Sequence, residues 1–266
     1  MIKEKVIILS GYGLNCEEET LHAFNHVGID GNIIHINDLI ENPKALDDHQ
    51  ILAIPGGFSY GDDTGSGNAF AQKMKLALWD DLKKFVERNT LTIGICNGCQ
   101  ILVNLGLVPA LNNYGEHDVA VTYNATARYQ CRWIDLKIES KSPWLTDIDR
   151  LHIPVAHGEG RFMMENTTLE ALKNNGQIAA QYINADGELA NCEFPANPNG
   201  SINDIAAITD KSGRVLAIMP HPERGMFTWQ RDDYHEIKDR AQRDGTELPE
   251  ESEGIHIFKN AAKYFS

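Results

Sequence analysis

Short apolar runs alternate with segments of helical periodicity along the first hundred residues. The runs occupy residues 6–9, 32–36, 51–54 and 91–95, and each is followed by glycine, proline or Asn/Asp turn chemistry. Their apolar positions do not alternate with polar ones, which is typical of strands covered on both faces. Strands that alternate with helices predict parallel pairing, and hence an α/β fold: a doubly wound three-layer sandwich with a mostly parallel central sheet.

The clearest helix is predicted for residues 68–88. Its apolar side chains recur every three or four positions and form one buried stripe, made of Met74, Leu78, Leu82 and Phe85. A similar spacing at 257–265 predicts a closing amphipathic helix.

The middle of the chain is richer in β-like pieces, at residues 119–123, 131–138, 178–183 and 205–208. These pieces are interpreted as an extension of the same sheet. Because no linker-like run and no internal repeat separates them from the first part, a single domain over residues 1–266 is expected. Residues 231–253 hold nine acidic and four basic side chains and are predicted to form a charged loop or insertion.

Composition narrows the function classes. Apolar residues make up 42% of the 266 positions and charged residues 23%, an ordinary globular balance. The net charge of −14 opposes a nucleic-acid partner. No apolar run approaches the roughly 18 residues of a membrane span, so no membrane role is expected. Five cysteines, an odd number at low density, favour the reducing cytoplasm.

The sharpest local signal is Gly-Ile-Cys-Asn-Gly at residues 94–98, directly after an apolar strand. Small residues on both sides of Cys96 are what a tight strand-to-helix nucleophile turn requires, and a helix N-terminus favours the thiolate. Two other interpretations stay open. Cys96 is a buried packing residue, or Cys96 and Cys99 form a redox pair. A zinc site is disfavoured because no second ligand pair completes it.

A base for this thiol is offered by His221, which follows the apolar run 215–219. Pro222 favours an extended backbone at His221, so the side chain of Glu223 points to the same side as the imidazole. A surface turn stiffened by prolines is the alternative. Gly56 and Gly57, after the run 51–54, suit a loop whose backbone N–H groups stabilise an oxyanion, with a second N–H from Asn97. A phosphate loop is discounted because its G-x-x-x-x-G-K-[ST] pattern is absent.

Together, PGGFSYGDD (55–63), GICNGCQ (94–100) and MPHPER (219–224) resemble the class I (triad) glutamine amidotransferases, which have a flavodoxin-like fold. With HGEGRF (157–162), they are similar to the branch that serves as the glutaminase of phosphoribosylformylglycinamidine synthase in purine biosynthesis. The resemblance implies Cys96 as nucleophile, His221 as base and then acid, and Glu223 as its orienting group. It further implies Gly57 and Asn97 as oxyanion donors and Gln100 as a substrate-binding residue. The part played by His157, Glu159 and Arg161 does not follow from it.

The implied reaction is hydrolysis of L-glutamine to glutamate and ammonia through a cysteine thioester. The implied partners are an ATP-dependent synthetase subunit, which converts formylglycinamide ribonucleotide to formylglycinamidine ribonucleotide, and a small bridging subunit. No cofactor and no metal are expected in this chain, with ATP and magnesium assigned to the synthetase. The rival functions are a thiol oxidoreductase that uses Cys96 and Cys99, a cysteine hydrolase of the same fold, and a non-catalytic binding module.

Overall fold

The computed structural model describes residues 4–266, and strands from both ends of this range join one sheet. Within these residues, nine strands pair in the order β2-β1-β3-β4-β11-β10-β9-β6-β7. The first five are parallel neighbours, and the pairs beyond β11 are antiparallel. The predicted α/β fold with a central sheet is confirmed.

The parallel half consists of β1 (Lys5–Ser10), β2 (Asp30–His35), β3 (Ile51–Ile54), β4 (Leu91–Ile95) and β11 (Val215–Ile218). The run predicted at 32–36 differs from the structure: β2 ends at His35 and has no fully buried residue, because it is the edge strand of the sheet. The antiparallel half is formed by β6 (Gln130–Ile138), β7 (Arg150–His157), β9 (Ile178–Ile183) and β10 (Ile205–Thr209). The piece predicted at 119–123 does not extend this sheet. It forms β5 (Ala120–Thr122), which pairs with β8 (Arg161–Met163) in a separate ribbon.

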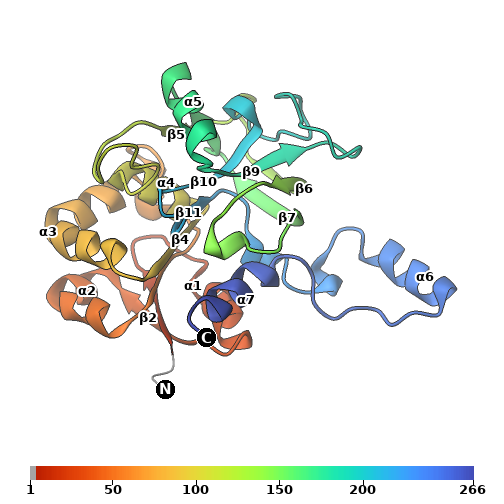
Figure 1. Cartoon of the computed structure of the whole chain (residues 1–266), viewed down its shortest axis with the longest axis horizontal. Helices are drawn as coiled ribbons and strands as arrows, with labels where there is room; N and C mark the ends of the chain where they lie inside the picture. Colours follow the sequence, from red (N-terminus) through yellow and green to blue (C-terminus); the bar gives the residue numbers. More distant parts are fainter. Residues whose placement is uncertain (1–3) are drawn as a thin grey trace.

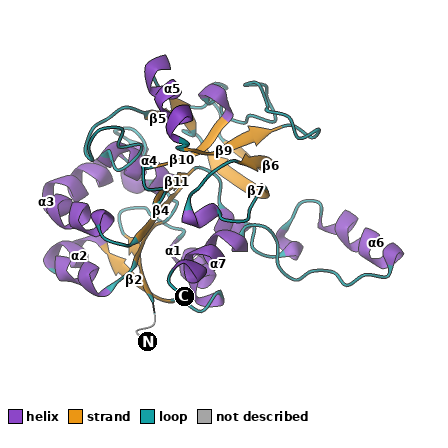
Figure 2. Ribbon diagram, viewed as in Figure 1, coloured by secondary structure: helices purple, strands orange, loops and turns teal. Residues whose placement is uncertain are grey.

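Helices cover both faces of the sheet and complete the three layers (Figures 1 and 2). On one side lie α2 (Ile36–Glu41), α3 (Asn68–Glu87) and α4 (Asn97–Leu105), and on the other α1 (Glu17–His26) and α7 (Ile255–Tyr264). The predicted helices at 68–88 and 257–265 correspond to α3 and α7. Helix α5 (Asn166–Asn175) packs near the antiparallel half. No described helix is both long and apolar enough to cross a membrane.

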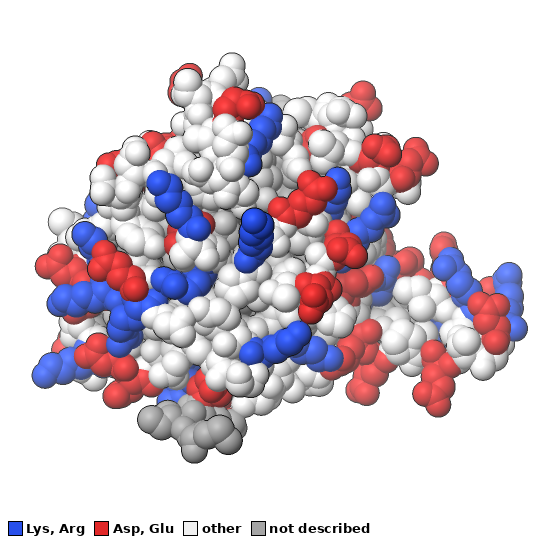
Figure 3. All heavy atoms as spheres, viewed as in Figure 1, with Lys and Arg blue, Asp and Glu red and all other residues white. Residues whose placement is uncertain are grey.

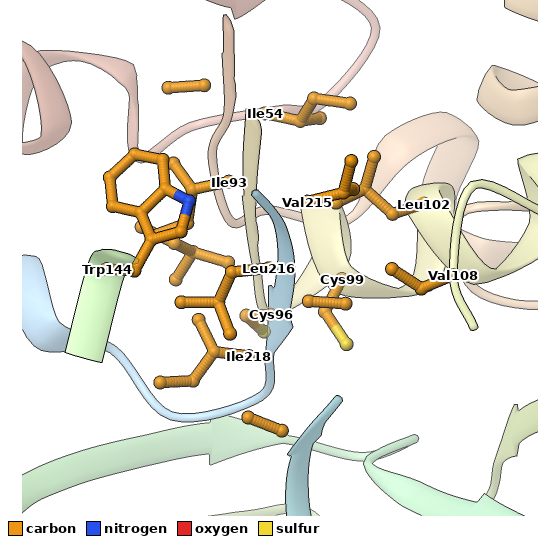
Figure 4. Close-up of a cluster of buried hydrophobic side chains, with 14 of the residues drawn as sticks. Ile54, Ile93, Cys96, Cys99, Leu102, Val108, Trp144, Val215, Leu216 and Ile218 are labelled. Atoms are coloured by element: carbon orange, nitrogen blue, oxygen red, sulfur yellow. The ribbon is translucent and has the colours of Figure 1, made fainter. Parts of the chain in front are cut away.

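The core fills the spaces between the sheet and the two helical layers. Around β4 and β11, Trp144, Ile93 and Leu216 lie on one side and Leu102, Cys99 and Val108 on the other (Figure 4). All six side chains are at most 1% exposed. Burial of each large apolar side chain contributes about 1.5–3 kcal/mol, so this packing holds the ends of β4 and β11 firmly in place.

The segment predicted to be a charged loop contains a helix, α6 (Tyr234–Asp244), which projects from the body on two long connections (Figure 1). Positively and negatively charged side chains both lie on this projection (Figure 3). Good helix formers and pairs such as Arg243 with Asp239, four residues apart, explain why a helix forms here. At its base, His152 lies 2.9 Å from both Asp135 and Asp232 and ties the projection to the sheet.

Replacing Leu102 with alanine is expected to lower the free energy of unfolding by about 2–5 kcal/mol, because Leu102 is fully buried and packs against Gly94 in β4. The matched control is Leu76→Ala on α3, since Leu76 is 88% exposed and its truncation should cost less than about 0.5 kcal/mol. Denaturant unfolding of both variants measures the difference. Equal losses would contradict the assigned core.

Candidate active site

Three neighbouring strands deliver the residues singled out from the sequence. In the sheet, β4 lies between β3 and β11, and all three run in parallel. Gly56 and Gly57 follow β3, Cys96 follows β4, and His221 lies three residues after the end of β11. Because the carboxyl ends of parallel strands meet at one edge, these residues converge where open α/β sheets bind ligands.

Cys96 occupies a strained turn between β4 and α4. Its φ of 52° is positive, which is uncommon for a residue other than glycine and typical of functional turns. The flanking glycines make the turn possible: a Cβ on Gly98 would lie 1.8 Å from the Ile54 carbonyl oxygen, and a Cβ on Gly94 would lie 2.4 Å from the Gly98 carbonyl oxygen. The local sequence therefore folds as predicted, with the thiol raised at the sheet edge and at the first turn of α4.

His221 is buried and paired with Glu223. A hydrogen bond of 2.5 Å joins His221 Nδ1 to Glu223 Oε1, while the His221 N–H donates to the Pro154 carbonyl at 2.8 Å. Burial alone disfavours the imidazolium, but the Glu223 carboxylate and the adjacent Cys96 raise the pKa of His221 well above its ordinary value. His221 Nε2 is buried and has no hydrogen-bond partner within residues 4–266.

The predicted oxyanion residues lie on either side of the thiol. Gly57 has a φ of 155°, and a Cβ there would come within 2.4 Å of the Gly13 carbonyl oxygen. Asn97, the first residue of α4, is fully buried; its side-chain oxygen accepts from the Ser59 N–H at 3.0 Å and its amide donates to Gln100 at 2.7 Å. The chain is thus fixed on both sides of Cys96.

A cavity of about 230 Å³ opens beside Cys96. Gly57 and Gln100 also line it, and Gln100 Nε2 donates to the Glu159 carbonyl at 2.5 Å. The remaining lining residues come from the loops around it: Phe58, Asp62, Ser66, Tyr123, Ala127, Arg128, Tyr129, Ala156, His157, Gly158 and Glu159. A small molecule placed here meets the thiol directly.

Of the three residues whose part the resemblance left open, two line this cavity. They are His157 and Glu159. Burial and the nearby His221 lower the pKa of His157 to about 3. The Arg161 guanidinium instead donates to the Gly200 carbonyl at 3.0 Å and fastens the ribbon of β5 and β8.

Cys16 is the residue that sequence reasoning missed. Its buried thiol lies beside His221 and accepts a hydrogen bond of 2.9 Å from Arg224 Nη2, and burial raises its pKa. The available signal was topological, because the loop after β1 reaches the same sheet edge as Cys96. Cys99, by contrast, is wholly buried in α4, and burial raises its pKa well above the usual value.

Two groups within residues 4–266 bring metal-ligating atoms together: Cys16, His221 and Glu223, and His152, Asp232 and Asp233. In the first group, Nδ1 of His221 is taken by Glu223, and the Arg224 guanidinium contacts the Cys16 sulfur. In the second, the two ring nitrogens of His152 are bonded to Asp135 and Asp232. In each group, a carboxylate of the chain therefore already engages at least one ring nitrogen of the histidine.

A thiol on a strained strand-to-helix turn, beside a His–Glu pair and a small cavity, is the arrangement typical of cysteine-dependent enzymes. The chain belongs to the CobB/CobQ-like glutamine amidotransferase domain family, whose model matches residues 3–265.

Curated relatives match almost the whole chain. "Phosphoribosylformylglycinamidine synthase subunit PurQ" of Methanococcus maripaludis is 50% identical, over 98% of this chain and 97% of that protein. The protein of the same name from Dehalococcoides mccartyi is 40% identical, over 99% and 98%. The solved structure of PurLQS from Thermotoga maritima contains a chain that is 26% identical, with a TM-score of 0.70 and coverage of 99% and 100%.

A glutamine analogue with an electrophile at the amide position is expected to add once, on the Cys96 peptide, because Cys96 borders the cavity whereas Cys99 lies in the core. Peptide mass spectrometry locates the adduct. An electrophile without the amino-acid moiety serves as the control and should label the exposed Cys131 and Cys192. An adduct of the glutamine analogue on Cys99 would instead favour the redox pair.

Proposed function

We infer that this chain is the glutaminase subunit of phosphoribosylformylglycinamidine synthase. It hydrolyses L-glutamine to glutamate and ammonia for de novo purine biosynthesis. The observation that carries this proposal is the Cys96 turn, which lies beside the His221–Glu223 pair and lines a cavity. The subunits from two organisms are 50% and 40% identical to this chain over almost its whole length, which supports the same activity.

The proposed reaction follows from the geometry. Cys96 attacks the side-chain amide carbon of glutamine, and the N–H groups of Gly57 and Asn97 stabilise the oxyanion. His221 protonates the departing ammonia and then activates water to hydrolyse the γ-glutamyl thioester, while Glu223 keeps the imidazole oriented. Gln100, which lines the cavity, contributes to the binding of glutamine.

The ammonia passes to a synthetase subunit, which converts formylglycinamide ribonucleotide to formylglycinamidine ribonucleotide. The related solved structure is described as PurLQS, which supports a complex with a synthetase and a small third subunit. ATP and magnesium would bind the synthetase, since this sequence has no G-x-x-x-x-G-K-[ST] loop. The cytoplasm is the proposed compartment of the complex.

The thiol oxidoreductase is the weaker candidate. A redox pair requires a second thiol that is accessible for exchange, yet Cys99 is wholly buried and burial raises its pKa. The redox function also gives no part to the His221–Glu223 pair.

Cys96→Ala in the reconstituted complex is expected to abolish glutamate release, because no other described thiol occupies the turn. Cys99→Ala is the matched control and should retain most of the activity, since it only removes a sulfur from the core. Glutamate release is measured for both, and ammonium-dependent synthesis should survive in Cys96→Ala. Full glutaminase activity without Cys96 would refute the assignment.

His221→Asn is expected to slow thioester formation by at least ~10²-fold, the typical contribution of general acid–base catalysis. Glu223→Gln should slow thioester formation less than His221→Asn does, because it disturbs only the orientation and charge of the imidazole. Single-turnover kinetics with labelled glutamine separate thioester formation from hydrolysis. If both variants matched the parent enzyme, this triad would be wrong.

A further inference from the structure

The loop that joins β1 to α1, residues 11–16, pairs with the loop that follows β3. The Cys16 N–H donates to the Gly56 carbonyl at 3.2 Å, and an isolated antiparallel β-bridge joins Leu14 to Gly57. The segment that carries the proposed oxyanion N–H of Gly57 is therefore held in place by the loop that precedes α1.

Three parts of the structure meet at Gly56. A Cβ on this glycine would lie 2.8 Å from His221 Cε1 and 3.1 Å from the Cys16 sulfur. It would also lie 3.5 Å from the Cβ of Cys96. The Cys16 sulfur itself lies within 4.8 Å of a ring nitrogen of His221. The imidazole therefore has two cysteines as neighbours, and a side chain at position 56 would push them apart.

Arg224 fixes the Cys16 sulfur. This arginine is the last residue of the MPHPER motif, and the triad gives it no part. Arg224 Nη2 donates to Cys16 Sγ at 2.9 Å, and its Nε donates to Glu19 Oε1 at 3.0 Å. Because Glu19 lies in the first turn of α1, these contacts join the loop after β11 to the start of that helix. Hydrogen bonds with a charged partner are the stronger ones, so the thiol is held in one position relative to the imidazole.

The surroundings of Cys16 do not suit it for substrate binding or for nucleophilic attack. Cys16 does not line the cavity beside Cys96. It is 1% exposed, and burial raises its pKa, which keeps the sulfur protonated and unreactive. What the sulfur acts on is the imidazole: together with Glu223 and Cys96, Cys16 raises the pKa of His221.

We propose that Cys16 is a positioning residue for the glutaminase reaction. Its sulfur, fixed by Arg224, keeps the imidazole of His221 turned toward Cys96. Its N–H keeps Gly56 in place, so one loop aligns both the general base and the oxyanion loop. A misplacement of about 1 Å can slow a reaction by roughly 10²-fold, which gives a contact behind the base a large effect. This inference rests on the proposed glutaminase function and deepens it.

The test measures glutamate release against glutamine concentration in the complex reconstituted with the synthetase and the small subunit. Cys16→Ala should lower kcat by about 10-fold or more, because the imidazole loses its support. KM should change by less than about 3-fold, since the cavity is untouched. Cys16→Ser restores an acceptor for Arg224 and should bring kcat back to within about 3-fold of the parent. Cys99→Ala is the matched control, because it removes an equally buried thiol from the core and should retain most of kcat.

The rate at which iodoacetamide alkylates Cys96 separates positioning from a loss of stability. This reagent carries no amino-acid moiety, so its rate reports the thiolate and the base beside it. The rate should fall in Cys16→Ala and recover in Cys16→Ser, while ammonium-dependent synthesis stays at the parent level in both. An unchanged alkylation rate, a kcat equal to that of the parent, or a rise in KM alone would overturn the proposal. A Cys16→Ser enzyme as slow as Cys16→Ala would overturn it as well.

Arg224→Gln tests the other half of the pair. It should lower kcat as Cys16→Ala does, and the double variant should be no slower than the slower single variant, because both changes break the same contact. Effects that multiply would show that the two residues act separately and would overturn their pairing. If Cys16→Ala does not fold, Arg224→Gln decides by the same comparison of kcat with KM. A parent complex that released no glutamate would refute the proposed function itself, which is a distinct result.

Discussion

The contact between α4 and the end of β3 is the constraint on which the site depends. Gly98 lies so close to the Ile54 carbonyl that no side chain fits between them. This approach forces the sharp turn after β4 and places Cys96 at a positive φ, at a cost of about 1–3 kcal/mol. Burial of Leu102 and its neighbours offsets that cost, because these side chains anchor α4 on the sheet. The thiol is therefore positioned by the core and not by a mobile loop.

The first turn of α4 also shapes the walls of the cavity. Asn97 accepts from the Ser59 backbone and donates to Asp62, while Gln100 links Asn97 to the Glu159 carbonyl. Two loops that are remote in the sequence are thus fastened to the helix that begins directly after Cys96. A change at Asn97 would disturb the proposed oxyanion N–H and the cavity together, so this one residue would link binding to chemistry.

Sequence reasoning worked where the signal was local. The runs 51–54 and 91–95 predicted β3 and β4 because apolar residues predominate in both strands, and the two-residue spacing of His221 and Glu223 predicted their contact. It missed two contacts between loops that are far apart in the sequence. The approach of Asp62 to Glu159, and of Cys16 to His221, requires loops that are far apart in the sequence to share one sheet edge. No periodicity or spacing in the sequence indicates these two contacts. Knowledge of the order of the parallel strands would have shown which loops share the edge.

The charges around the cavity also bear on the fate of the product. His221, with its raised pKa, stands beside Cys96, and Asp62 and Glu159 lie elsewhere on the cavity wall. Carboxylates that attract an ammonium group would retain the ammonia that the reaction makes, once it is protonated.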